Sequence, residues 1–285
     1  MSMTQRRRPV ISFATSKGGS GKSTCCIVLA GVLADQGGRV AIIDTDPTQT
    51  VYRWAQKDGR PKGIEVYSAT SEDELLDAID DASPKNHVIL IDVEGRASVV
   101  GNMAMGKSSL VIVPVQPSEP DGHEAAKTIR AIKTAARAHE RDIKFAAVMN
   151  RIAGAIRSNT YKDVVQQFAS GGVPIAAHLV DREAYRRIFM EGGTIFTLES
   201  NSKSQVAQLK KARAEAYVFG EQIGRMVGLV DGGGGQAADE TIAEAAVDTF
   251  RRAAMASLDT EDGEGETLDD LATSTMRDLE TEASR

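Results

Sequence analysis

The stretch Ser16-Lys17-Gly18-Gly19-Ser20-Gly21-Lys22-Ser23-Thr24 decides the fold of this chain. It follows an apolar run that predicts a strand over Val10–Ala14, and it opens a pattern that predicts a helix over Ser23–Asp35. A glycine-rich turn between a strand and a helix lets backbone N–H groups approach phosphate oxygens, and the helix dipole favours an anion there. We therefore expect a phosphate-binding loop in which Lys22 reaches the β- and γ-phosphates and Ser23 ligates Mg²⁺.

Short apolar runs alternate with helical patterns along the rest of the chain as far as residue 230. This alternation predicts an α/β fold, with a mostly parallel twisted sheet and helices on both of its faces. Burial of both faces explains an unbroken apolar run such as Val-Ile-Leu-Ile at 88–91. The other expected strands are Val40–Ile43, Ile64–Tyr67, Val88–Ile91, Leu110–Val113, Lys144–Met149 and Ile175–His178, and the other expected helices are Glu72–Asp80, Gly122–Ala138, Asn159–Phe168 and Ser204–Met226.

Charge divides the chain into two unequal parts. Residues 231–285 hold 15 acidic and 4 basic residues, a net of −11, which leaves a net of +5 on residues 1–230. We expect one domain over 1–230, followed by an acidic tail over 231–285 that begins with a glycine run and is disordered or partly helical. The mildly basic domain is compatible with a polyanionic partner in spite of the overall charge of −6.

Composition also bears on the cellular setting. No run approaches the roughly 18 apolar residues that a membrane-spanning helix needs. The only two cysteines, Cys25 and Cys26, are adjacent, which excludes a disulfide framework and favours packing roles in the first helix. The four histidines have no metal-ligand spacing. A reducing cytoplasm is the expected location.

The segment KGGSGKST resembles the deviant Walker A motif of the ParA and MinD ATPases, a branch of the P-loop NTPases. The resemblance extends over about residues 9–225, and the short stretch before Pro9 favours the DNA-partition branch without an N-terminal helix-turn-helix module. In that family the lysine matching Lys17 crosses a dimer interface to the partner's phosphates, where it would act as an arginine finger does. The resemblance therefore implies an ATP-bound homodimer with Lys17, Lys22 and an aspartate as catalytic groups. The nucleotide would contact Lys17, Gly18, Gly19, Ser20, Gly21, Lys22, Ser23 and Thr24.

Two acidic segments follow predicted strands. Asp44-Thr45-Asp46-Pro47-Thr48-Gln49 is similar to the family's DxDPQ segment with Thr48 inserted, which implies that Asp46 activates the attacking water and Asp44 helps to hold Mg²⁺. Asp92 ends an apolar strand, as the Walker B aspartate does, and would also hold Mg²⁺. Glu94 and Gly95 stand where the family commonly has DxPP, so the second switch differs here.

The segment Val148-Met149-Asn150-Arg151 resembles the family's base-reading segment, which implies that Asn150 contacts the base. Guanine-specific relatives have an NKxD motif, and the position of its aspartate is Ala153 here, so ATP is favoured over GTP.

ParA proteins also bind DNA non-specifically through basic residues in their C-terminal part. The candidates here are Arg182, Arg186, Arg187, Lys210 and Lys211, with Lys203 and Arg213 beside them; a solvated helix face is the alternative.

The leading functional hypothesis is an ATPase that dimerises on ATP, binds nucleoid DNA without sequence preference and partitions plasmid or chromosomal DNA. A ParB-like or other cargo adaptor would stimulate its slow hydrolysis. The first alternative is a ParA-like accessory of conjugative DNA transfer or a positioning ATPase for a protein cargo. A MinD-like membrane ATPase is disfavoured, because the acidic end would be repelled by anionic lipid.

Overall fold

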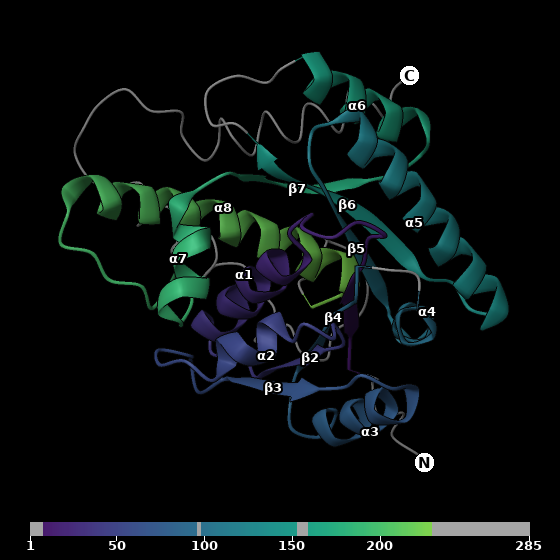
Figure 1. Ribbon diagram of the computed structural model, residues 1–285, viewed down its shortest axis with the longest axis horizontal. Helices are drawn as coiled ribbons and strands as arrows, with labels where there is room; N and C mark the ends of the chain where they lie inside the picture. The colour runs from purple at the N-terminus through teal and green to yellow at the C-terminus, as the bar shows by residue number, and fades with distance from the viewer. Residues whose placement is uncertain (1–7, 96–97, 153–158, 230–285) are drawn as a thin grey trace.

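The computed structural model describes residues 8–95, 98–152 and 159–229, and within them a seven-stranded sheet forms the centre of the molecule (Figure 1). The strand order is β3-β2-β4-β1-β5-β6-β7, and every described pair is parallel. The strands are β1 (Val10–Phe13), β2 (Val40–Asp44), β3 (Ile64–Ser68), β4 (Val88–Asp92), β5 (Leu110–Val115), β6 (Lys144–Ile152) and β7 (Ile175–Val180).

Helices cover both faces of this sheet (Figure 1). One face packs against α1 (Lys22–Asp35), α2 (Thr50–Ala55), α7 (Glu183–Glu191) and α8 (Lys203–Val227). The other face packs against α3 (Glu72–Ala82), α4 (Val99–Lys107), α5 (Glu119–Ala138) and α6 (Asn159–Ser170). Successive residues of β1, β2, β4 and β5 are buried on both sides, as a covered parallel sheet requires.

The strand order places the glycine-rich loop and the two acidic segments at one edge of the sheet. β4 lies between β1 and β2, with Phe13 and Asp44 both in register with Asp92. The loop after β1 and the two aspartates therefore meet at the carboxyl ends of adjacent strands, where open α/β sheets bind ligands.

The predicted α/β fold is confirmed, and each expected strand and helix lies in a strand or helix of the structure, except that β1 ends at Phe13, one residue before the expected end at Ala14. The sequence analysis did not single out α2, α4 and α7, which have 6, 9 and 9 residues. Cys25 and Cys26 are fully buried in α1, as expected of packing residues. Helix α8 ends before Gly228, which adopts a left-handed conformation at φ 72°. The predicted tail over 231–285 lies outside the described residues, and its separation from the domain stays a prediction.

Candidate nucleotide-binding site

The glycines of the loop between β1 and α1 are required by its backbone. Gly19 and Gly21 have φ of 75° and 101°, a region that residues with a Cβ rarely adopt. A Cβ on Gly21 would also lie 1.8 Å from Nδ2 of Asn150. Helix α1 begins immediately afterwards at Lys22, so its first N–H groups and its dipole face the loop.

Two side-chain amides hold the loop from outside. Asn150 donates from Nδ2 to the carbonyl of Ser20 at 2.9 Å, and Gln116 donates from Nε2 to the carbonyl of Gly19 at 3.1 Å. Oδ1 of Asn150 accepts from the N–H of Arg151 at 2.9 Å. In the nucleotide-free chain the Asn150 amide is thus engaged with the phosphate loop and its own strand end, and a contact with the base stays a prediction.

Lys22 is placed among acidic groups at the bottom of the loop. It is only 7% exposed, and its Nζ donates to the carbonyl of Lys17 at 3.4 Å. Burial lowers the pKa of Lys22, while Asp92, Asp46 and Glu94 oppose that shift by their charge. A phosphate group would supply the counter-charge that this buried ammonium needs.

Ser23 and Asp92 form a pair suited to a divalent cation. The Ser23 hydroxyl donates to Oδ2 of Asp92 at 2.6 Å, and Asp92 is buried. Burial raises the pKa of Asp92 to about 7, although the bond from Ser23 and the charge of Lys22 lower it. Oδ1 of Asp92 is buried and finds no hydrogen-bond donor among the described residues. An orphaned carboxylate oxygen beside a hydroxyl fits Mg²⁺, which prefers oxygen ligands.

The carboxylate of Asp44 accepts three hydrogen bonds from backbone N–H groups. Its Oδ1 accepts from the N–H of Asp46 at 3.1 Å, and its Oδ2 accepts from the N–H groups of Val51 and Tyr52 at 2.8 and 2.9 Å. Both oxygens therefore hold the β2–α2 turn and the start of α2, whose N-cap residue, Gln49, makes no side-chain cap. A contribution of Asp44 to the Mg²⁺ shell stays a prediction, because each carboxylate oxygen has two lone pairs and can accept more than one partner.

Asp46 lies nearer the solvent, next to the inserted residue of its motif. Its Oδ1 accepts from the N–H and the hydroxyl of Thr48 at 2.8 and 2.7 Å. The insertion therefore has a physical role, because Thr48 fixes the orientation of the Asp46 carboxylate.

The segment after β4 approaches the loop closely. A Cβ on Gly95 would lie 3.2 Å from Nζ of Lys22 and 3.3 Å from the backbone of Gly18. The glycine of the divergent Asp-Val-Glu-Gly segment thus leaves room for the Lys22 ammonium beside the phosphate loop.

Helix α5 contributes residues that the sequence analysis missed. Nζ of Lys17 lies 2.9 Å from Oδ2 of Asp121, which also accepts a hydrogen bond from the N-cap residue Ser118. The Ser16 hydroxyl donates to Oε2 of Glu124 at 2.6 Å, and the Ser16 N–H donates to the Thr128 hydroxyl at 3.2 Å. The spacing of 121, 124 and 128 on one helix face is a signal that could have pointed to them.

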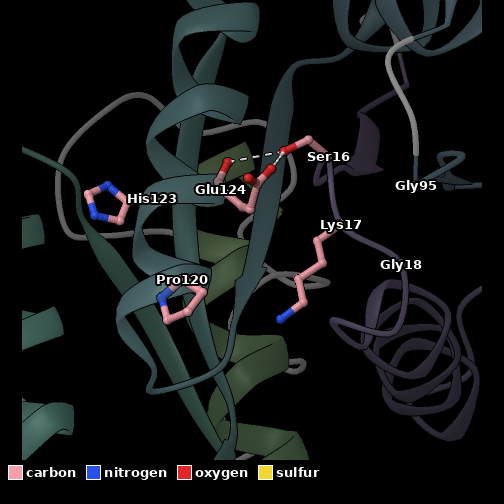
Figure 2. Close-up of a pocket in the computed structure, with 7 residues that line it drawn as sticks. All are labelled: Ser16, Lys17, Gly18, Gly95, Pro120, His123 and Glu124. Carbon is pink, nitrogen blue, oxygen red and sulfur yellow. Dashed lines mark hydrogen bonds between the residues drawn. The ribbon is translucent and has the colours of Figure 1, made fainter.

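Ser16, Lys17 and the first turns of α5 border an open depression of about 570 Å³, together with Gly18 and Gly95 (Figure 2). Figure 2 shows Ser16 turned toward Glu124 and the side chain of Lys17 extending from the loop. The side chain of Lys17 is 42% exposed, whereas that of Asp121 is 6% exposed. Lys17 is therefore held by a residue of its own chain, and it is still accessible from the solvent.

A smaller cavity of about 120 Å³ is bordered by the start of α1, the end of β6 and α7. Thr24, Asn150 and Arg151 line it, together with Val180, Asp181, Tyr185, Arg186 and Phe189. Its aromatic and polar lining suits a nucleobase, and Thr24 connects it to the phosphate loop.

The basic residues expected to contact DNA are engaged within the protein. Arg182 pairs with Glu215 through two nitrogens, Arg186 pairs with Asp181 and Glu183, and Arg187 pairs with Glu191. Arg213 donates to the carbonyls of Ile195, Phe196 and Leu198. These ion pairs and hydrogen bonds hold α7 and α8 in place, and DNA binding through the three arginines stays a prediction. Lys203 and Lys211 are exposed and Lys210 is half-buried on α8.

One protein family matches the part of the chain that contains this site. The family model described as VirC1 protein matches residues 9–228, which include the whole phosphate loop, both acidic segments and α5. The chain belongs to the VirC1 family.

A curated relative, Protein ParA of Rhizobium radiobacter, is 32% identical over 212 residues, which cover 74% of this chain and 96% of the relative. Among solved structures, the ATP complex of McdA from Cyanothece superposes with a TM-score of 0.60 at 13% identity, covering 82% of this chain and 99% of that one. MinD of Pyrococcus horikoshii with Mg-ADP gives a TM-score of 0.57 at 17% identity, covering 78% and 98%. The structural matches show the fold alone, and the family and the ParA relative make this VirC1-family chain a ParA-type, partition-type ATPase.

Among the described residues no helix is both long and apolar enough to span a membrane.

Proposed function

We propose that this chain binds Mg²⁺-ATP at the phosphate loop and hydrolyses it slowly to ADP and phosphate. The observation that carries the proposal is the group of Lys22, Ser23 and Asp92, in which a buried ammonium faces a hydroxyl–carboxylate pair with one orphaned oxygen. Lys22 would bind the β- and γ-phosphates, and Ser23 and Asp92 would hold the cation. When bound, Mg²⁺ would supply charge stabilisation for phosphoryl transfer.

Within this proposal Asp46 orients the attacking water. Its carboxylate is fixed by Thr48 and is close enough to Lys22 to affect the pKa of that lysine by charge. Magnesium-bound and nucleotide-bound relatives of the same fold support the assignment of both cofactors.

Two chains would meet across the depression beside Lys17, with Lys17 of each chain reaching the nucleotide of the other. The exposed position of this lysine at the rim supports the proposal. The ATP-bound homodimer would then bind double-stranded DNA without sequence preference and partition plasmid or chromosomal DNA from a nucleoid-associated, cytoplasmic position. A ParB-like or other cargo adaptor would stimulate hydrolysis.

Membership of the VirC1 family favours a second candidate, an accessory role in conjugative DNA transfer. The two candidates share the ATP switch and differ in the cargo that the dimer would carry.

The test of ATP binding is calorimetric titration of the full chain with a slowly hydrolysed ATP analogue and Mg²⁺. Lys22→Ala is expected to abolish binding, because the phosphates lose their main counter-charge, whereas Lys62→Ala, an exposed lysine before β3, is expected to bind as the wild type does. Equal affinity of the wild type and Lys22→Ala would overturn the assignment.

A further inference from the structure

Helix α5 carries a row of cations along its outer face. Lys127, Arg130, Lys133 and Arg137 are all exposed, and their spacing of 3, 3 and 4 residues places them on one side of the helix. The row is about 15 Å long at the helical rise of about 1.5 Å per residue. α5 runs along the outside of the layer that covers β5 and β6, on the opposite side of the sheet from α7 and α8 (Figure 1).

These cations are less neutralised than the arginines of α7. Lys127 pairs with Glu124 at 2.6 Å, but no carboxylate in the described part of the chain pairs with Arg130, Lys133 or Arg137. Nζ of Lys133 lies 5.8 Å from the ring centroid of Phe145, an interaction that leaves its charge in place.

Basic residues next to the C-terminal end of α5 lengthen its row of cations. Arg141 donates to the carbonyl of Gly106 at 3.0 Å, which brings the end of α4, with exposed Lys107, beside the end of α5. Glu140 and Asp142 are exposed at the same end, so the uncompensated part of the row is centred on residues 130–137.

We propose that this basic face of α5, defined by Lys127, Arg130, Lys133 and Arg137, is the surface that binds duplex DNA. The proposal rests on the proposed DNA-binding function and assigns it to a surface on the opposite side of the sheet from the one expected from the sequence. Phosphate recognition needs clustered cations with no base-reading geometry, and a row of this length spans about 9 phosphate charges of a duplex at one per about 1.7 Å.

The chemistry of the face favours DNA over a lipid surface. The exposed large hydrophobic residues of the described chain are Val99, Met190 and Val206, and none of them lies on α5. An interfacial helix would need an apolar face to insert beside its cations, which this surface lacks. Lys127, the first cation of the face, lies about one turn after His123 and about two turns after Pro120, which border the depression.

The first experiment compares two triple variants of the full chain that remove the same charge. Arg130→Gln/Lys133→Gln/Arg137→Gln removes the uncompensated cations of α5 with a residue that keeps helix propensity. Arg53→Gln/Lys62→Gln/Lys85→Gln removes three exposed cations near the far edge strand β3 and serves as the control. Affinity for an unrelated duplex is measured with Mg²⁺-ATP at several salt concentrations.

The α5 variant is expected to lose the larger part of the affinity, and the slope of log affinity against log salt should become shallower by about 2.7, or about 0.9 per lost phosphate contact. The control should keep the wild-type slope. Wild-type binding with an unchanged slope in the α5 variant would overturn the surface and leave the DNA-binding function standing. Absence of DNA binding by the wild type at low salt would overturn both the surface and the DNA-binding function. Binding of polyglutamate that duplex DNA does not displace would overturn the proposal and assign the face to an acidic protein instead.

The second experiment keeps every cation in place. Thr134→Cys puts a thiol on the exposed side of α5, while Cys25 and Cys26 stay inert because both are fully buried and burial raises the pKa of Cys25 to about 12. A photocrosslinker attached there should react with duplex DNA in the presence of Mg²⁺-ATP. The same label on Asp77→Cys, exposed on α3, is the control, and stronger crosslinking from α3 than from α5 would contradict the proposal.

Discussion

The ammonium of Lys17 lies 2.9 Å from a carboxylate oxygen of Asp121 in its own chain. This ion pair places the lysine that is proposed to cross to a partner in contact with the first turn of α5 instead. Formation of the dimer would therefore require Lys17 to exchange Asp121 for the phosphates of the partner's nucleotide. In the proposed dimer, Asp121 would thus compete with the partner's nucleotide for the charge of Lys17.

Removal of this competitor should favour the dimer. Asp121→Asn keeps the bond to Ser118 but removes the charge, and a partly exposed ion pair contributes up to about 1 kcal/mol, or roughly a fivefold change. We expect the ATP-dependent dimer to form at a several-fold lower protein concentration than in the wild type, as measured by sedimentation. Glu119→Gln, an exposed acid of the same helix turn, is the control. Weaker dimerisation of Asp121→Asn would show that the carboxylate supports the dimer and does not oppose it.

Substitution of Asn150 tests whether this residue stabilises the phosphate loop or recognises the base of the nucleotide. Asn150→Ala removes a buried hydrogen bond to Ser20, a loss of about 1–3 kcal/mol in such settings. Because the lost contact is to the phosphate loop, ATP and GTP affinities should fall by the same factor, about 5- to 150-fold. Competition titrations with both nucleotides measure that ratio, and Gln116→Ala should behave alike through its bond to Gly19. A loss confined to ATP would show that Asn150 recognises the base.

Stability of the nucleotide-free protein should depend on the protonation of Asp92. Its pKa is raised by burial from 3.8 to about 7, so between these values the folded state holds a proton that the unfolded state has released. Stability is therefore expected to fall as pH rises from 4 to 7, by a few kcal/mol at about 1.4 kcal/mol per pKa unit. Burial also raises the pKa of Asp44, which adds a contribution of the same sign.

Urea unfolding of the wild type and of Asp92→Asn at pH 5 and pH 7.5 isolates this contribution. The variant should lose part of the pH dependence and keep the part that comes from Asp44. Identical pH profiles of the two proteins would show that Asp92 stays ionised in the folded state.

The sequence predicted the fold well because its signals are local. Two kinds of signal are each only a few residues long: the glycine-rich loop at 18–21, and the unbroken apolar runs that end at Asp44 and Asp92. Parallel pairing of the strands brings them to one edge of the sheet. Lys22, Ser23 and Asp92 lie together as expected for the same reason.

The roles of Asn150, Asp44 and the α7 arginines depend on partners that the sequence does not reveal. Asn150 and Ser20 are 130 positions apart, and Arg182 meets Glu215 only because α8 packs against α7. The basic row of α5 was not predicted, because the resemblance to ParA proteins implies DNA-binding residues in the C-terminal part of the chain, and α5 precedes that part.

We propose that ATP switches this chain between a monomer and a dimer through Lys17. Asp46→Ala should block hydrolysis while leaving binding intact, so this switch can be tested by the mass of the full-length variant, measured by light scattering with saturating Mg²⁺-ATP. We expect the mass of two chains for Asp46→Ala, and the mass of one chain when Lys17→Ala is added or ATP is replaced by ADP. A one-chain mass for Asp46→Ala under saturating ATP would contradict it.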